Sequence, residues 1–127
     1  MVNIKNPSLG IRREFQSPWW EITVDYTAEF APNEFNILFT DAIKIWEIDD
    51  GIFGGDNDVV KPHEGTHETF VPGSASVPRH KVRWVTTDDL NTEGGVEEIA
   101  AQVWLGNSPV PPGNYAEVFT GVQGLDV

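Results

Sequence analysis

A dense group of oxygen-bearing side chains occupies residues 45–60, a stretch that contains three glycines and no arginine. The side chains that could bind a hard cation are Glu47, Asp49, Asp50, Asp56, Asn57 and Asp58. Calcium takes about six to eight oxygen ligands at variable distances, and a loop rich in Asp and Gly can wrap around it. The segment therefore predicts a Ca²⁺ site. The alternative is an acidic turn that is simply solvated.

A second acidic segment follows later in the chain, between two expected strands. Its candidate ligands are Asp88, Asp89, Asn91 and Glu93. These residue types are also common in hairpin turns, so an ordinary turn is the competing interpretation. If both acidic segments lie at the same end of the domain, they could share ions.

The pattern in residues 45–60 resembles one calcium-binding loop of C2 domains. Trp46 ends a predicted strand, spaced acidic residues follow from Glu47, and Asp58 precedes two aliphatic residues, Val59 and Val60. The resemblance implies a β-sandwich whose loops at one end bind Ca²⁺ and, in many members of the family, then bind phospholipid. The chain departs from the family pattern in having glutamate at position 47, where aspartate is expected, and in a longer loop.

A histidine motif matches the zincin signature His-Glu-x-x-His at His63, Glu64 and His67. That chemistry needs both histidines on one face of a helix, with the glutamate as general base. Pro62 and Gly65 argue against such a helix. We therefore expect an exposed polar loop and a noncatalytic protein, and a metal-dependent hydrolase is a remote alternative.

Two adjacent tryptophans, Trp19 and Trp20, are candidates for partner binding. Neighbouring residues of a strand face opposite sides of a sheet, so one of the two indoles is expected to point outward. An exposed tryptophan could stack on a sugar ring or fill a pocket of a partner. Packing in the core or at an edge is the competing interpretation.

Alternation of residue types marks the clearest strand, residues 20–30. Apolar Ile22, Val24 and Tyr26 alternate with acidic or threonine side chains, the pattern of a strand with one buried face. Residues 35–48 predict one long bent strand or two short ones, with Asp41 at the bend. The proline-containing residues 61–78 predict mainly loop with at most a short edge strand.

Further strands are expected towards the C-terminus. Residues 79–87 predict a strand with Val82 and Trp84 facing inward and with Lys81 and Arg83 facing outward. Its basic side chains would then pair with carboxylates of the next strand.

Residues 96–105 have an ambiguous period. Ile99, Ala101 and Val103 alternate as in a strand, although Glu97 and Glu98 would also suit a helix. We predict a strand here and a last strand within residues 113–122.

Short strands separated by turn signals predict an all-β fold, an antiparallel two-sheet β-sandwich that is C2-like or immunoglobulin-like. Residues 1–127 are expected to form a single domain. The sequence contains no apolar run long enough to span a bilayer and no recognisable signal peptide. We therefore expect a soluble protein, whose cellular localisation the sequence does not determine.

Composition limits the classes of partner. The formal net charge is -12, with only 8 Lys and Arg residues, so binding to nucleic acid is not expected. The absence of cysteine removes disulfides and thiolate metal sites. We predict a noncatalytic Ca²⁺-binding module that presents a loop surface to a carbohydrate, membrane or protein partner. The alternative is a structural or assembly protein that packs through strand edges and proline-rich loops, including as a homo-oligomer.

Overall fold

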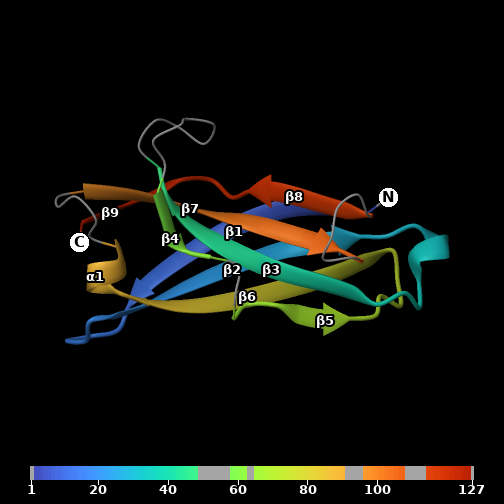
Figure 1. Cartoon of the computed structure of the whole chain (residues 1–127), viewed down its shortest axis with the longest axis horizontal. Helices are drawn as coiled ribbons and strands as arrows, with labels where there is room; N and C mark the ends of the chain where they lie inside the picture. Colours follow the sequence, from blue (N-terminus) through green and yellow to red (C-terminus); the bar gives the residue numbers. More distant parts are fainter. Residues whose placement is uncertain (1, 49–57, 63–64, 91–95, 108–113, 127) are drawn as a thin grey trace.

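The computed structural model of the chain describes residues 2–48, 58–62, 65–90, 96–107 and 114–126. These residues form two antiparallel sheets. The smaller sheet contains β1 (Asn3–Arg13), β2 (Trp19–Glu29) and β6 (Ser76–Thr86), in the order β1-β2-β6. Figure 1 shows these long strands running nearly the whole length of the molecule, with the two chain ends at opposite sides of the view.

The larger sheet has β3 (Phe39–Glu47) and β7 (Val96–Gly106) at its centre. The strands β4 (Asp58–Lys61) and β5 (Glu68–Phe70) pair with β3, and β8 (Tyr115–Phe119) and β9 (Gln123–Asp126) pair with β7. Two single turns of helix complete the described elements, η1 (Pro32–Glu34) and α1 (Thr87–Leu90).

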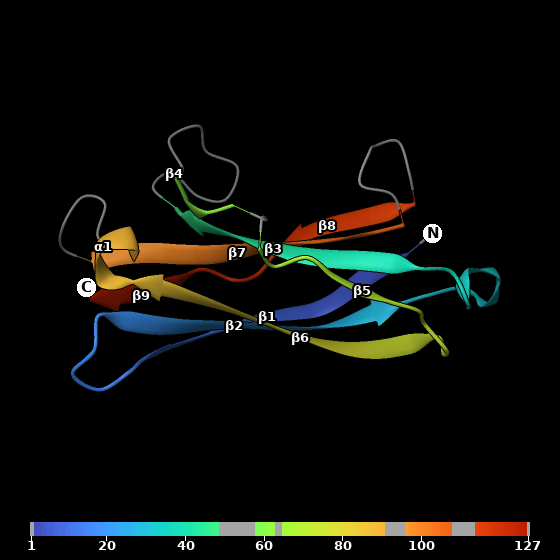
Figure 2. The ribbon, with the colours of Figure 1, turned by 60° about the horizontal axis from the view of Figure 1, so that its bottom comes forward.

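The two sheets stack face to face, as Figure 2 shows, with β1, β2 and β6 in one layer and β3, β7 and β8 in the other. This arrangement confirms the predicted all-β, two-sheet sandwich. None of the helices among the described residues is both long and apolar enough to cross a bilayer.

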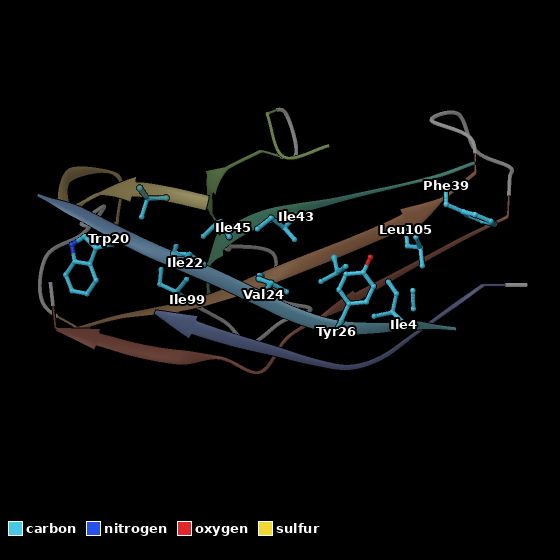
Figure 3. Close-up of a cluster of buried hydrophobic side chains, with 14 of the residues drawn as sticks. Ile4, Trp20, Ile22, Val24, Tyr26, Phe39, Ile43, Ile45, Ile99 and Leu105 are labelled. Carbon is cyan, nitrogen blue, oxygen red and sulfur yellow. The ribbon is translucent and has the colours of Figure 1, made fainter. Parts of the chain in front are cut away.

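The core lies between the layers and follows the alternation predicted for β2. Ile22, Val24 and Tyr26 point from β2 towards Ile43 and Ile45 of β3, and all five are buried (Figure 3). The strand thus places one apolar face against the opposite sheet and leaves its acidic and threonine face outside.

The strand predicted at residues 96–105 is also confirmed. Ile99, Ala101, Val103 and Leu105 of β7 are all fully buried, and their period of two matches the pleat of a strand. The helix-compatible residues of this segment do not decide its structure, because pairing with β3 on one side and with β8 and β9 on the other fixes it as a central strand.

The strand β1 was not predicted, and its register explains why. Lys5 pairs with Thr27 and Ser8 pairs with Asp25, so two residues of β1 lie opposite the single residue Tyr26. This β-bulge shifts the inward and outward positions along β1 by one residue. Asn6, within the bulge, has a φ of 53°. A period-two pattern therefore cannot be followed through the strand.

The predicted orientation of β6 is wrong. Lys81 is buried, with 1% of its surface exposed, whereas Trp84 is 42% exposed and Val82 also faces outward. The register places Lys81 opposite Val24, on the inner face, and Arg83 opposite the buried Ile22. The physical reason is that Asp41 and Glu68 of the larger sheet neutralise the inward charge of Lys81.

The bend predicted at Asp41 is also absent. β3 is continuous from Phe39 to Glu47, and Asp41 pairs in register with Leu105 of β7 and Glu68 of β5. Asp41 interrupts the apolar run because its side chain enters the core, where it is 0% exposed.

Candidate functional site

One end of the larger sheet carries the borders of both acidic segments. β3 ends at Glu47, β7 begins at Val96, and Glu47 pairs with Ile99. The antiparallel register therefore places the end of β3 beside the start of β7. Asp49, Asp50, Asp56 and Asn57, together with Asn91 and Glu93, lie outside the described residues. The described residues that flank the two acidic segments, the end of β3 and the start of β7, therefore lie at the same end of the sheet, as the sharing of ions would require.

Glu47 is the predicted ligand that the structure places most clearly. It is the last residue of β3, its side chain is buried, and it pairs in register with Asp58, the first residue of β4. A second buried carboxylate, Glu97, stands near the start of β7. Because Glu47 lies opposite Ile99, Glu97 is its diagonal neighbour on the inner face. Two buried carboxylates thus adjoin the borders of the acidic segments.

Asp89 has a structural role at the same end. The Thr86 backbone N–H donates a hydrogen bond to the Asp89 carboxylate (2.9 Å), and the Asp89 N–H donates to the Thr86 hydroxyl (3.1 Å). This reciprocal pair caps α1. Lys61 of β4 forms an ion pair with the same carboxylate at 3.2 Å, whereas the neighbouring Asp88 is exposed. Asp89 therefore joins α1 to β4. Its carboxylate already contacts Thr86 and Lys61, which leaves less of it available to bind a metal ion.

Replacing Asp89 with alanine is expected to lower the free energy of unfolding by about 0.5–2 kcal/mol at neutral pH, the usual value of a helix cap. Burial raises the pKa of Asp89, but the hydrogen bonds from Thr86 and the ion pair with Lys61 bring it below its ordinary value of 3.8. Its stabilising contribution is therefore complete above that value and is lost as the pH falls through the lower pKa of the folded state.

Urea denaturation of the wild type and of Asp89→Ala at several pH values measures this contribution. The difference in unfolding free energy should be constant between about pH 7 and 5 and should shrink below about pH 4. The exposed neighbour provides the control, since Asp88→Ala should change the stability little. A difference that persists unchanged at about pH 3 would contradict an ionised Asp89 cap.

The histidine motif is only partly described, because His63 and Glu64 lie outside the described residues. The described remainder is not helical: Gly65 has a φ of +83°, and the exposed His67 leads directly into β5. Thr66, between them, is buried and bridges the backbone of Ile43 through its hydroxyl. This backbone differs from the helix that zincin chemistry requires.

The two predicted partner-binding tryptophans point in opposite directions, as expected. Trp19 is 45% exposed on the outer face of β2. Trp20 is buried, its indole N–H donates to the Thr87 hydroxyl at 3.0 Å, and the Arg13 guanidinium lies over its ring. Trp19 therefore remains a candidate contact residue, whereas Trp20 anchors α1 and is not accessible to a partner.

A polar cluster that the sequence analysis does not predict lies between the two sheets. Its members are Tyr26 of β2, Asp41 of β3, Glu68 of β5, Arg79 and Lys81 of β6, and the backbone carbonyl of Thr66. Arg79 donates to both carboxylate oxygens of Asp41, from Nε to Oδ2 at 2.8 Å and from Nη2 to Oδ1 at 3.2 Å. The Tyr26 hydroxyl donates to Oδ2 at 2.6 Å.

Lys81 completes this cluster. Its Nζ donates to Asp41 Oδ1 at 2.8 Å, to the Thr66 carbonyl at 2.8 Å and to Glu68 Oε1 at 2.6 Å. A lysine ammonium has three donors, and all three are used here. The cluster therefore connects β6 of the smaller sheet to β3 and β5 of the larger one.

The electrostatics of the cluster follow from these contacts. Burial alone would raise the pKa of Asp41, but the hydrogen bonds from Arg79 and Lys81 hold it below its ordinary value. Burial, and next the negative charge of Asp41, raise the pKa of Tyr26, so this hydroxyl remains a donor. The Arg79 guanidinium also lies 4.1 Å from the ring centroid of Phe70, which covers it from the side of β5.

A signal for this cluster was present in the sequence. An aspartate within an apolar strand must be paired if it is buried. The strand at residues 76–86 offers Arg79, Lys81 and Arg83 at alternate positions, hence on one face. Together, these two features predict that the basic face of the strand at residues 76–86 points inward, towards the aspartate.

The described residues contain no group of three or more His, Cys, Asp or Glu side chains arranged to hold a metal ion. A comparison with models of known protein families gives no match, and a comparison with curated proteins gives none either.

Among solved structures, the chain is similar to one described as the X-ray structure of Northeast Structural Genomics Consortium target SoR45. The two share 10% sequence identity with a TM-score of 0.41, over 98% of this chain and 85% of that chain.

Proposed function

We propose that the protein is a noncatalytic binding module that takes up Ca²⁺ at the end of the larger sheet where β3 ends and β7 begins. The observation that carries the proposal is the pair of buried carboxylates, Glu47 and Glu97, beside the borders of the two acidic segments. Carboxylate oxygens are ligands that Ca²⁺ prefers, and these two come from the paired strands β3 and β7 at the same end of the larger sheet.

Charge supports the same proposal. The chain has a net charge of -12, and its surface field attracts cations to acidic loops. The segment between β3 and β4 supplies Asp49, Asp50, Asp56 and Asn57, which are oxygen ligands of the kind Ca²⁺ prefers. The ion would act by fixing the conformation of these loops, which would then form the recognition surface. The resemblance to the C2 loop points to the same ion.

Thermal melting tests the proposal. Protein stripped with a chelator should melt at a higher temperature after addition of Ca²⁺, because a ligand that binds only the folded state stabilises it. Parallel melts with Mg²⁺ and Zn²⁺ show whether the effect is specific to calcium. If millimolar Ca²⁺ does not raise the melting temperature, calcium uptake by the folded domain is refuted.

A role in assembly is the second candidate, and the outer face of the smaller sheet favours it. Trp84 and Val82 of β6 and Trp19 of β2 are exposed there, and β6 is the last strand in the order β1-β2-β6 of the described residues. Exposed apolar side chains on an edge strand are a feature of surfaces that bind other chains. Light scattering should then detect an oligomer that Trp84→Ser dissociates. A monomeric wild type would favour the calcium module.

A further inference from the structure

The buried polar cluster brings an amine and a carboxylate into direct contact. Lys81 Nζ lies 2.8 Å from Asp41 Oδ1, and the two side chains are almost completely removed from water. They come from β6 and β3, strands of opposite sheets. An amine and a carboxyl group that are held together out of water are the two reactants of an amide bond.

We propose that Lys81 and Asp41 condense to an intramolecular amide that covalently joins the two sheets, with Glu68 as the proton acceptor. This modification is independent of calcium binding, because the cluster lies within the sandwich between β3, β5 and β6. Formation of the bond needs no oxidant and no cofactor.

The atoms of the condensation balance within the cluster. One proton moves from the Lys81 ammonium to Asp41 Oδ1 along their hydrogen bond, which leaves a neutral amine and a carboxylic acid. The amine nitrogen attacks Cγ of Asp41, and Glu68 Oε1, 2.6 Å from Nζ, accepts a second proton. The Cγ–Oδ1 bond then breaks, and the departing hydroxyl takes the proton from Glu68. The products are one amide and one water molecule.

The existing hydrogen bonds fit both the intermediate and the product. Tyr26 and Arg79 Nε donate to Asp41 Oδ2, the oxygen that carries the negative charge after attack and becomes the amide carbonyl. The third proton of Lys81 stays on nitrogen and points to the Thr66 carbonyl. Every polar group of the amide therefore already has a partner, as burial requires.

Two physical effects drive the reaction forward. Condensation replaces a buried ammonium and a buried carboxylate by a neutral amide, which removes the desolvation cost of both ions. Fixed contact also replaces a bimolecular encounter, and effective molarities of well-oriented groups reach about 10⁵–10⁸ M. The ion pair with Arg79 opposes the first proton transfer, because it stabilises the ionised form of Asp41, so we expect the bond to form slowly after folding.

Mass spectrometry of the denatured full-length chain tests the proposal. The mass should be lower than that of the sequence by one water molecule. Trypsin should then release residues 14–44 joined to residues 80–83, since an acylated Lys81 is not cleaved. The variant Lys81→Arg keeps a cation but should show the unmodified mass.

The role of Glu68 has its own test. Its side chain is 58% exposed, so Glu68→Gln should fold, and a time course after refolding should show a slower loss of water than in the wild type. Glu98→Gln, an exposed glutamate of β7, is the matched control and should keep the wild-type rate. A folded wild type that keeps the full sequence mass after prolonged incubation overturns the proposal. Equal rates in Glu68→Gln and the wild type would overturn the role of Glu68.

Discussion

Replacing Asp41 with alanine is expected to lower the free energy of unfolding by about 3–5 kcal/mol, the largest loss we predict for any single substitution. Asp41 accepts hydrogen bonds from Tyr26, Arg79 and Lys81 and is the shared counter-charge of the two cations. Without it, Lys81 remains buried with only the partly exposed Glu68 to balance its charge. The proposed amide would also be lost, which would increase the effect.

Urea denaturation followed by tryptophan fluorescence measures this loss. Asp25→Ala is the matched control, because Asp25 is also a strand aspartate, and it contacts His80 on the exposed outer face. Exposed ion pairs contribute little, so this control should lose no more than about 1 kcal/mol. Similar losses in the two variants would show that the buried cluster does not hold the sheets together.

A second expected result concerns calcium. Replacing Glu47 with glutamine should weaken Ca²⁺ binding by at least about tenfold, since even residues that only support a metal ligand commonly change affinity by about 10–100-fold. Glutamine keeps the size of the side chain and removes only its charge. Asp49→Asn and Asp58→Asn, in the same segment, should weaken binding in the same direction.

Titration of each variant with Ca²⁺ checks this result, with Glu98→Gln as the control on the neighbouring strand. Glu98 is exposed, whereas Glu47 is buried, so only the latter substitution should reduce affinity. Circular dichroism of the calcium-free variants separates a binding effect from a folding effect. Wild-type affinity in a folded Glu47→Gln variant would remove Glu47 from the site.

The sequence predicts those parts of the fold in which local pattern and burial agree. β2 alternates strictly between apolar and polar residues, and in β7 the apolar residues from Ile99 onward recur at every second position, so Ile22 and Ile99 lie on the inner face as expected. β1 is missed because its bulge beside Asn6 breaks the alternation. The short C-terminal strand β9 offers too few alternating residues to be recognised.

The predicted orientation of β6 is wrong for a different reason. Local polarity places Lys81 outside and Trp84 inside, and the structure has the reverse. The decisive partner, Asp41, stands 40 positions away in the sequence on the other sheet, so no local pattern contains the compensating charge. The buried cluster was therefore not accessible to strand-by-strand reasoning, although an aspartate in an apolar strand indicates that a cation is needed nearby.

The candidate calcium site was likewise only partly predictable from the sequence. Its residue types and spacing are visible in the sequence, but the nearness of the described borders of the two acidic segments depends on the pairing of β3 with β7. Glu47 and Asp58 lie opposite each other, and Glu47 pairs with Ile99 near the start of β7. The buried position of Glu97 beside this candidate site could not be predicted, because it follows from the inner face of a strand with an ambiguous pattern.

Calorimetric titration of the chelator-stripped wild-type protein with Ca²⁺ tests the central proposal most directly. We expect saturable binding of Ca²⁺, with weaker binding of Mg²⁺, because the smaller ion demands a more regular set of ligands. Binding should be reduced in Glu47→Gln and unchanged in Glu98→Gln. The contradicting result would be a wild type that shows no heat of binding at Ca²⁺ concentrations up to millimolar and no change in melting temperature. The assembly role would then be the better account of the protein's function.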